Sequence, residues 1–116
     1  MWATAVREIL RFFGIIPRPG VLAQVADRYP TPQQLIAGVL VVVVDRGRQK
    51  WGCLRCPCGC GDKIQLSLSP ERRPRWSVNI DWLARPSVEP SIHQVDGCRS
   101  HFWIRRGQIV WCKDLN

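Results

Sequence analysis

The most specific chemical feature of the sequence is a run of cysteines separated by Pro and Gly, Cys56-Pro57-Cys58-Gly59-Cys60-Gly61. Thiolates this close together at a Gly-containing bend can converge on one ion, because glycine lets the backbone turn its N–H groups towards the sulfurs. Near neighbours bridge as disulfides only with strain, and a disulfide framework would scatter its cysteines along the chain. The spacing therefore predicts a metal site, and zinc is the expected ion.

Zinc in a structural site takes four ligands, so at least one more must come from elsewhere in the chain. Cys98 is the natural candidate, with Cys112 and His101 as alternatives for the fourth place. Cys53 is predicted to be a buried thiol that does not bind the metal. The predicted ligands are Cys56, Cys58, Cys60 and Cys98. A structural zinc would also stabilise so small a fold. The alternatives are a catalytic zinc and a redox or disulfide role for the cysteines.

The composition points to one basic domain. A chain of 116 residues with 46% hydrophobic residues can bury one modest core. The longest apolar run, Val39 to Val44, is far shorter than the roughly 20 residues of a membrane-spanning helix. We therefore expect a cytoplasmic protein without membrane contact. Seventeen basic against nine acidic residues give a net charge of +8, which implies a nucleic acid, an acidic protein or an acidic peptide as partner.

The first third of the chain has the spacing of helices. Apolar residues recur at intervals of three and four between Trp2 and Phe13, with Arg7 and Glu8 on the opposite face. The same pattern between Val21 and Tyr29 predicts a second helix, and Thr31 before Pro32 predicts a capped helical turn reaching towards Gly38. Residues 1–37 are thus predicted to be a helical appendage whose apolar faces cover a sheet.

The rest of the chain has the pattern of strands. The β-branched run 39–45 predicts a strand buried on both faces, paired with 50–56 through a Gly-containing turn. Alternating residues predict strands at 63–69 and 76–80, and a hairpin joins 102–105 to 108–111. The expected fold class is α+β, a small, mainly antiparallel, zinc-stabilised β domain over residues 38–116 with N-terminal helices.

Several motifs resemble those of a small bacterial family encoded beside ubiquitin-like modifiers and their activating and conjugating enzymes. They are Lys50-Trp51, the cysteine run 56–61, Arg73-Pro74-Arg75-Trp76, Pro90-Ser91-Ile92 and the segment from Cys98 to Gly107. The resemblance extends over about Thr31 to Cys112. It implies a serine-dependent, deubiquitinase-like peptidase that cleaves or deconjugates the modifier. The implied partners are the modifier, its C-terminal tail and the enzymes of the pathway.

A serine nucleophile needs a base, and the sequence offers only His93 and His101. His101 lies inside the family-like motif and is the preferred base, although it could instead be a zinc ligand or an ordinary strand residue. His93 is expected in a loop. Asp81 or Asp96 could orient the imidazole, and the sequence does not choose between them.

Ser91 and Ser100 are the candidate nucleophiles. Consecutive side chains of a strand point to opposite faces, which disfavours a direct pair between Ser100 and His101 unless a bulge intervenes. Ser91 follows Pro90 at the end of a short strand and could approach the base from another segment. Either serine could instead be a turn or capping residue.

The tryptophans and arginines are the remaining residues that suggest a function. Trp76 and Trp82 are flanked by arginines and predict a basic, aromatic surface stretch that receives a peptide tail or stacks on bases. Trp51, Trp103 and Trp111 are expected in the core and around the metal site. Besides the peptidase, two functions stay open: a non-catalytic adaptor of the same pathway, and a zinc-dependent nucleic-acid-binding module. Nucleic-acid binding is expected to be weak.

Overall fold

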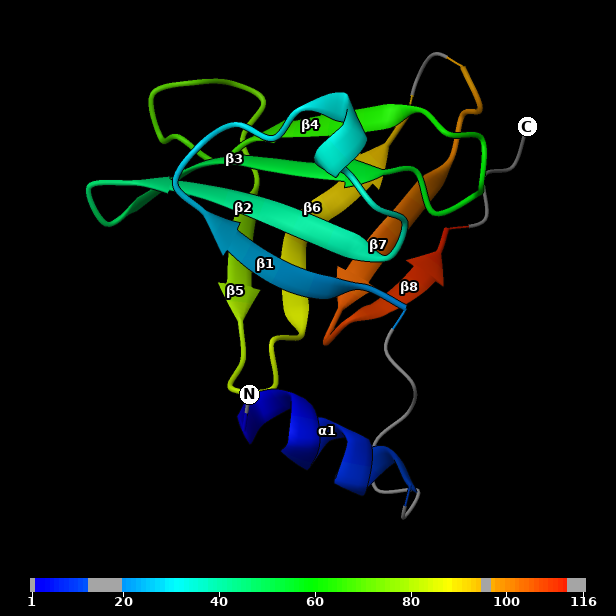
Figure 1. The fold of residues 1–116 in the computed structure, drawn as a ribbon. Helices are drawn as coiled ribbons and strands as arrows, with labels where there is room; N and C mark the ends of the chain where they lie inside the picture. Colours follow the sequence, from blue (N-terminus) through cyan, green and yellow to red (C-terminus); the bar gives the residue numbers. More distant parts are fainter. Residues whose placement is uncertain (1, 13–19, 95–96, 113–116) are drawn as a thin grey trace.

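Two four-stranded β-sheets form the body of the molecule (Figure 1). The computed structural model describes residues 2–12, 20–94 and 97–112. The strand order is β1-β2-β3-β4 in the first sheet and β5-β6-β7-β8 in the second. All neighbouring strands are antiparallel except β1 and β2, which are parallel. The expectation of a mainly antiparallel β domain is therefore confirmed, with one N-terminal helix instead of several.

The first sheet is built around the run of valines. Its strands are β1 (Leu22–Ala26), β2 (Val39–Asp45), β3 (Arg48–Arg55) and β4 (Lys63–Ser67). β2 lies between β1 and β3 and is buried on both faces over residues 40–43, as its β-branched composition predicts. Gly47 adopts φ 77° in the turn to β3, a conformation that favours glycine, and so closes the predicted hairpin.

The second sheet contains a strand that is longer than the sequence predicted. Its strands are β5 (Ser77–Ile80), β6 (Pro86–His93), β7 (His101–Arg105) and β8 (Gln108–Trp111). The hairpin of β7 and β8 is confirmed. β6 pairs with β5 on one side and with β7 on the other. Its full length was not predicted because it contains two prolines, which are uncommon inside strands. His93 is consequently the last residue of β6, and its predicted loop position is wrong.

The prediction of a second helix between Val21 and Tyr29 is also wrong. Residues 22–26 form β1, in which Leu22 pairs with Val39. The backbone amides of Gly20 and Val21 both donate to the Gly107 carbonyl, at 2.8 and 2.9 Å. The capping box predicted at Thr31 is present, but the helical turn it begins is a 3-10 helix of three residues, η1 (Pro32–Gln34).

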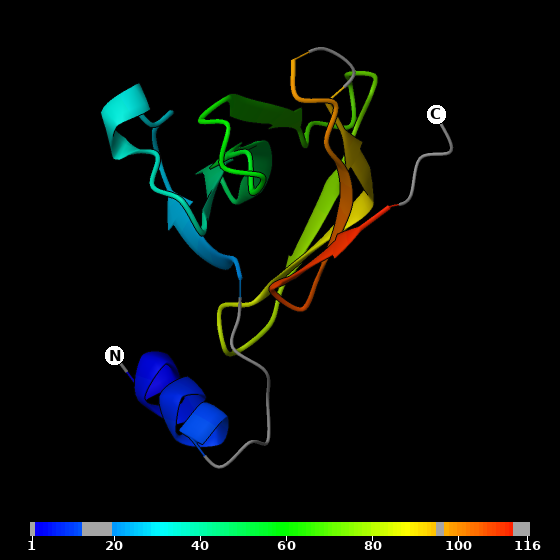
Figure 2. The same ribbon diagram turned by 90° about the vertical axis from the view of Figure 1, so that its right-hand side faces the viewer.

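The N-terminal helix α1 (Trp2–Phe12) is confirmed as a helix but not as a cover for a sheet. Figures 1 and 2 show it at one end of the two sheets, beside the loop that joins β5 to β6. Arg7, expected on the solvent side, is only 7% exposed, and its Nη1 donates to the Leu83 carbonyl at 2.8 Å. Ile9 faces solvent instead.

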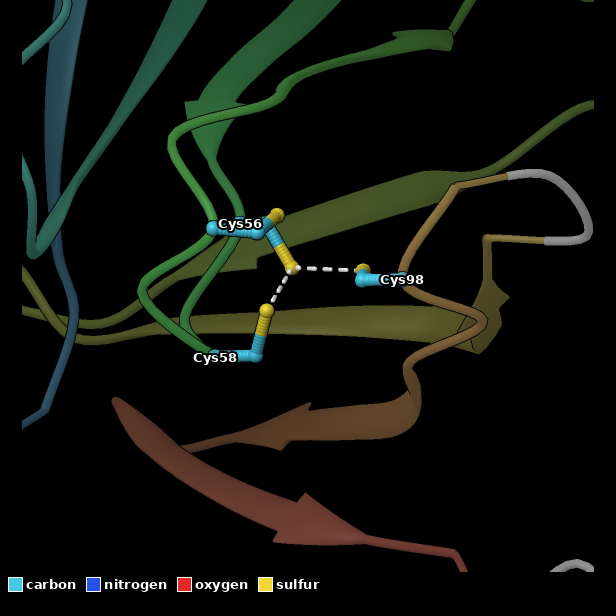
Figure 3. A group of neighbouring side chains, drawn as sticks. Cys56, Cys58 and Cys98 are labelled. Atoms are coloured by element: carbon cyan, nitrogen blue, oxygen red, sulfur yellow. Dashed lines mark hydrogen bonds between the residues drawn. The ribbon is translucent and has the colours of Figure 1, made fainter.

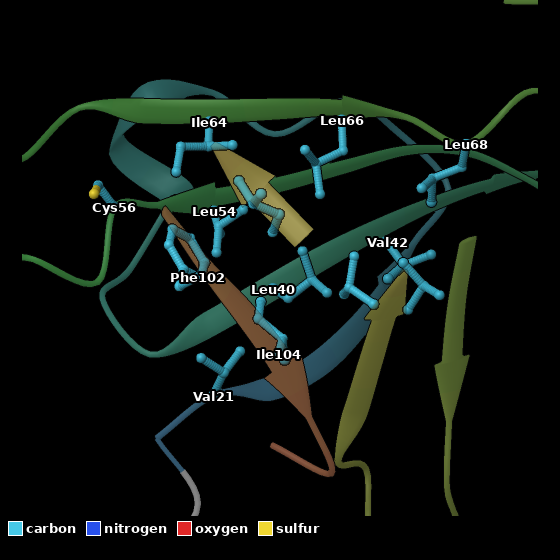
Figure 4. Close-up of a cluster of buried hydrophobic side chains, with 13 residues drawn as sticks. Val21, Leu40, Val42, Leu54, Cys56, Ile64, Leu66, Leu68, Phe102 and Ile104 are labelled. Atoms are coloured by element: carbon cyan, nitrogen blue, oxygen red, sulfur yellow. The ribbon is translucent and has the colours of Figure 1, made fainter. Parts of the chain in front are cut away.

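The core lies between the two sheets (Figure 4). The first sheet contributes Leu40, Val42, Leu54, Ile64 and Leu66, and the second contributes Val88, Ile92, Phe102 and Ile104, all buried. A smaller cluster around Val41, Val43 and Cys53 covers the outer face of the first sheet. Among the described residues, no helix has both the length and the apolar character needed to cross a membrane.

Candidate functional site

The four predicted cysteine ligands come together at one edge of the two sheets (Figure 3 shows three of them). The sulfurs of Cys56, Cys58, Cys60 and Cys98 all lie within 4.8 Å of one another. We call these four residues the cysteine cluster. Three come from the loop between β3 and β4, and Cys98 comes from the loop before β7. The two sheets therefore both contribute to the cluster.

The loop between β3 and β4 folds back on itself to gather its three thiols. The Cys56 amide donates to the Asp62 carbonyl at 2.9 Å, and the Gly59 amide donates to the Cys56 carbonyl at 3.2 Å. Gly59 and Gly61 have φ values of 92° and 85°, which L side chains rarely adopt. The alternation of Cys and Gly is thus what permits this tight bend.

The thiols of the cysteine cluster interact directly. Cys56 Sγ donates to Cys58 Sγ at 3.3 Å and lies 3.5 Å from Cys98 Sγ. Hydrogen bonds lower the pKa of the Cys58 thiol to about 6, and the bond with Ser100 has a larger effect than the bond with Cys56. The pKa of Cys98 is lowered as well, chiefly by its hydrogen bond with Ser100. Low thiol pKa values favour the thiolate, which is the form that binds a metal.

The pKa of Cys56, in contrast, is raised by burial. The Asp62 amide lowers the pKa of Cys60, but hydrogen bonding with Cys58 and burial outweigh this effect and raise that pKa to about 12. The four sulfurs lie close enough together to hold one metal ion.

The other two cysteines lie outside the cysteine cluster. Cys53 is buried on β3 beside Tyr29, and burial raises the pKa of its thiol. Cys112 follows β8, where its amide donates to the His101 carbonyl at 2.9 Å. Among the described residues, neither belongs to the group of thiols that could share an ion.

A second polar site lies on the outer face of the second sheet. Ser91 Oγ and His101 Nε2 are 2.9 Å apart, within hydrogen-bonding distance. Both side chains are half-buried. A serine hydroxyl in contact with an imidazole nitrogen is the arrangement that activates serine for nucleophilic attack. The structure therefore brings together the preferred base and one of the two candidate nucleophiles.

An irregularity in β6 lies beside this contact. Val88 pairs with Ile104 and Ile92 pairs with Phe102, so four steps along β6 match two steps along β7. The extra length is a bulge, which redirects the side chains between the two pairs. Ser91 lies at the end of this irregular segment, and its side chain contacts His101, which is paired with His93 in the regular ladder.

The other candidate nucleophile has a different environment. Ser100 Oγ lies 3.1 Å from Cys98 Sγ and 3.5 Å from Cys56 Sγ. Its backbone carbonyl accepts a hydrogen bond from the Gln94 amide at 2.7 Å. Ser100 thus contacts the cysteine cluster and orients its sulfurs, while His101 contacts Ser91.

His93 completes the site, and sequence reasoning did not assign it a role. Its ring stacks on that of His101, with centroids 4.5 Å apart and an angle of 15° between the planes. The two residues are direct partners across β6 and β7. Only the strand register reveals this relationship, since two histidines eight residues apart have no significance by themselves.

Asp81, one of the two aspartates proposed as orienting groups, does not join the site. Asp81 lies in the turn between β5 and β6, where its carboxylate accepts from the amides of Leu83 and Arg85 and from Arg85 Nε at 2.7 Å. That turn precedes β6, whereas His93 ends it, so most of the length of β6 separates Asp81 from the imidazoles. Asp96 lies outside the described residues.

The tryptophans are distributed differently from the prediction. Trp76 Nε1 donates to the Ser91 carbonyl at 3.2 Å, whereas Trp82 lies in the loop between β5 and β6, so the two do not form one surface. Trp103 is half-buried on the outer face of the second sheet and Trp111 is exposed, so neither lies in the core. Trp51 is half-buried on the outer face of the first sheet, with Tyr29 against it.

Comparison with known proteins gives one match. The model of the family described as bacterial ubiquitination-like system serine protease (BubE) matches residues 27–112. This range includes β2 to β8, the cysteine cluster, Ser91 and His101. No curated protein and no solved structure matches the chain.

Proposed function

Because the chain belongs to the family of bacterial ubiquitination-like system serine proteases, we propose that it is a serine peptidase that cleaves or deconjugates a ubiquitin-like modifier. The family expected from the sequence motifs is confirmed by the match. The observation that carries the finer proposal is the 2.9 Å contact between Ser91 Oγ and His101 Nε2. It supports Ser91 as the nucleophile and His101 as the base.

The proposed reaction follows from this contact. Neutral His101 accepts the hydroxyl proton at Nε2 as Ser91 Oγ attacks the carbonyl carbon of the modifier's terminal residue. The resulting imidazolium returns the proton to the departing amine, and an acyl-enzyme ester remains on Ser91. Water then loses a proton to His101 and attacks the ester, which releases the modifier with a free carboxylate and restores the serine.

His93 is proposed as a positioning residue for the base. Its ring covers one face of the His101 imidazole, which limits rotation of that ring away from Ser91. A base that must stay within hydrogen-bonding distance of its nucleophile benefits from such support.

We propose that the cysteine cluster binds one structural zinc ion. Four thiols from two separate loops are the donor set of a closed tetrahedral site, with no histidine or carboxylate in the described group. A bound zinc would supply folding free energy. It would also fix Cys98 and Ser100, which lie immediately before His101 in the chain.

The family supports the remaining parts of the proposal. The partners would be a ubiquitin-like modifier, its C-terminal tail and the activating and conjugating enzymes of the pathway. The reaction would take place in the bacterial cytoplasm.

A fusion protein tests the proposed activity. The ubiquitin-like modifier of the same pathway, carrying a reporter domain on its C-terminus, is incubated with the protein, and the products are identified by intact mass spectrometry. Cleavage directly after the modifier, lost in Ser91→Ala, supports the proposal. An intact fusion, or equal cleavage by wild type and Ser91→Ala, would show that the chain is not this peptidase and would favour the adaptor function.

A further inference from the structure

A groove of about 430 Å³ lies beside Ser91 on the outer face of the second sheet, and no function described so far uses it. Its lining includes Arg75, Trp76, Glu89, Pro90, Trp103 and Arg105. Pro90 immediately precedes Ser91, and Trp76 Nε1 donates to the Ser91 carbonyl at 3.2 Å. One end of the groove is therefore continuous with the backbone of the proposed nucleophile.

The direction of the groove follows from the alternation along β7. Phe102 and Ile104 are 0% exposed in the core, so His101, Trp103 and Arg105 share the opposite, outer face. At about 3.3 Å per residue, Arg105 lies about 13 Å along the strand from the base. An extended peptide covers that distance with about four residues. A substrate bound in the groove would thus place a side chain near Arg105 within about four residues of the cleaved bond.

The charges of the groove favour an acidic side chain. Two guanidinium groups, on Arg75 and Arg105, face a single carboxylate, on Glu89. Among the residues that the structure describes, neither arginine has a carboxylate oxygen within ion-pair distance. The Arg105 guanidinium lies over the Trp103 ring, 4.6 Å from its centroid. Stacking holds the planar guanidinium in place and leaves its N–H groups available for two hydrogen bonds to a carboxylate.

A peptide is a better occupant than a nucleic acid because of the neighbouring chemistry. Exposed tryptophan and arginine could stack on bases and bind phosphates. However, the groove adjoins a serine and histidine pair, and that pair acts on acyl groups, not on phosphodiesters.

From this juxtaposition we propose that the groove is a specificity subsite, which selects substrates with an aspartate or glutamate within about four residues of the cleaved bond. This inference rests on the proposed peptidase activity and adds to it the chemical class of the substrate. Arg105 is its principal specificity-determining residue.

Peptides that span the bond directly after the modifier in the fusion test the proposal. Each position within four residues of that bond is replaced in turn by Asp, Asn or Lys, and kcat/KM is measured for every peptide. We expect at least about a fivefold preference for Asp over Asn at one position, with Lys poorest there, and a smaller preference at high salt. Arg105→Glu should reverse the order of Asp and Lys.

The matched control is Arg48→Glu, which makes the same change of net charge at an exposed residue on the first sheet. It should keep the wild-type order of the three peptides. A binding measurement separates the subsite from turnover: fluorescence anisotropy of labelled Asp and Asn peptides with the Ser91→Ala variant should show the same preference, again lost in Arg105→Glu.

Distinct results would overturn the two proposals. If wild type cleaves neither the fusion nor the peptides, the peptidase proposal fails, while the anisotropy measurement still tests the groove. If peptides are cleaved without an acidic preference, or if Arg48→Glu and Arg105→Glu change it equally, the subsite is wrong. Displacement of the labelled peptide by single-stranded DNA at physiological salt, dependent on Arg105, would identify the groove as a nucleic-acid site instead.

Discussion

Ser100 and His101 are consecutive in the sequence, yet their side chains contact different groups: the Ser100 hydroxyl lies 3.1 Å from Cys98 Sγ, and His101 Nε2 lies 2.9 Å from Ser91 Oγ. The opposite orientation of neighbouring side chains at the start of β7 explains the separation. Two consecutive residues thus connect the cysteine cluster to the proposed catalytic pair. Changes in the cluster should therefore affect the position of the base.

The two candidate serines should differ sharply in a cleavage assay. Ser91→Ala should lower kcat/KM by at least about a thousandfold, because it removes the nucleophile. Ser100→Ala should retain turnover and cost about 1 kcal/mol of stability, through the lost hydrogen bonds to sulfur. Steady-state cleavage of the modifier fusion measures the first effect, and denaturant unfolding measures the second. Ser87→Ala is the control, since the Ser87 hydroxyl accepts from the Arg106 amide at the far end of β6 from His101. Loss of cleavage in Ser100→Ala alone would reverse the assignment.

His93 offers a test of the stacked rings. His93→Ala should reduce kcat about tenfold with little change in KM, because the His101 ring loses its support. His93→Phe keeps an aromatic ring in place and should recover a large part of the loss. If the Phe variant is as slow as the Ala variant, His93 acts through a polar contact, and the stacking argument is wrong.

Metal content should separate the cysteines into two groups. Cys60→Ser and Cys98→Ser should each abolish stoichiometric zinc binding and lower the free energy of unfolding by about 3 kcal/mol or more. Cys53→Ser should retain zinc, since the Cys53 side chain is buried in the smaller cluster that covers the outer face of the first sheet. Elemental analysis and chemical denaturation check both statements. Purified protein that contains no zinc but has disulfides by mass would contradict the metal site.

Removal of the metal should also slow cleavage. A chelator that strips the cysteine cluster frees the loop that leads into His101, so kcat should fall before the β-sheets unfold. Cleavage and far-UV circular dichroism followed over the same chelator titration distinguish this order. Simultaneous loss of both signals would mean that the metal acts on stability alone.

Nucleic-acid binding should be weak and dependent on salt. A chain with a net charge of +8 associates with polyanions at low ionic strength, and such binding falls steeply as salt rises. Fluorescence anisotropy with labelled single-stranded and duplex DNA should show little binding at about 0.2 M salt. Sequence-selective binding that persists there would favour the nucleic-acid-binding function.

Local patterns in the sequence predicted several elements correctly. The valine run of β2, the hairpin around Gly107 and the convergence of the cysteine run with Cys98 all depend on residues whose types restrict the backbone. The β1 segment was mistaken for a helix because its apolar residues recur at helical intervals. Its strand conformation depends on parallel pairing with β2, which begins only after the η1 segment.

The candidate site was harder to predict than the strands. The Ser91–His101 contact depends on how β6 and β7 are paired, and strand register beside a bulge cannot be predicted from residue types. The same register places His93 on His101. Asp81 was a poor candidate because an Asp near a turn commonly bonds to nearby backbone amides.

The bulge in β6 has a consequence for how activity can be gained or lost. Side chains of a strand point alternately to its two faces, so Val88 and Ile92 would still point into the core after removal of Glu89 and Pro90. They would also keep their present partners, Ile104 and Phe102. Ser91 would then pair with Trp103 in a regular ladder instead of approaching His101. We therefore expect the two-residue deletion to keep the core and to weaken the proposed activity, because Ser91 would leave its present position relative to His101. The proposed chemistry would then depend on the length of one segment on the outer face, with no change in the interior.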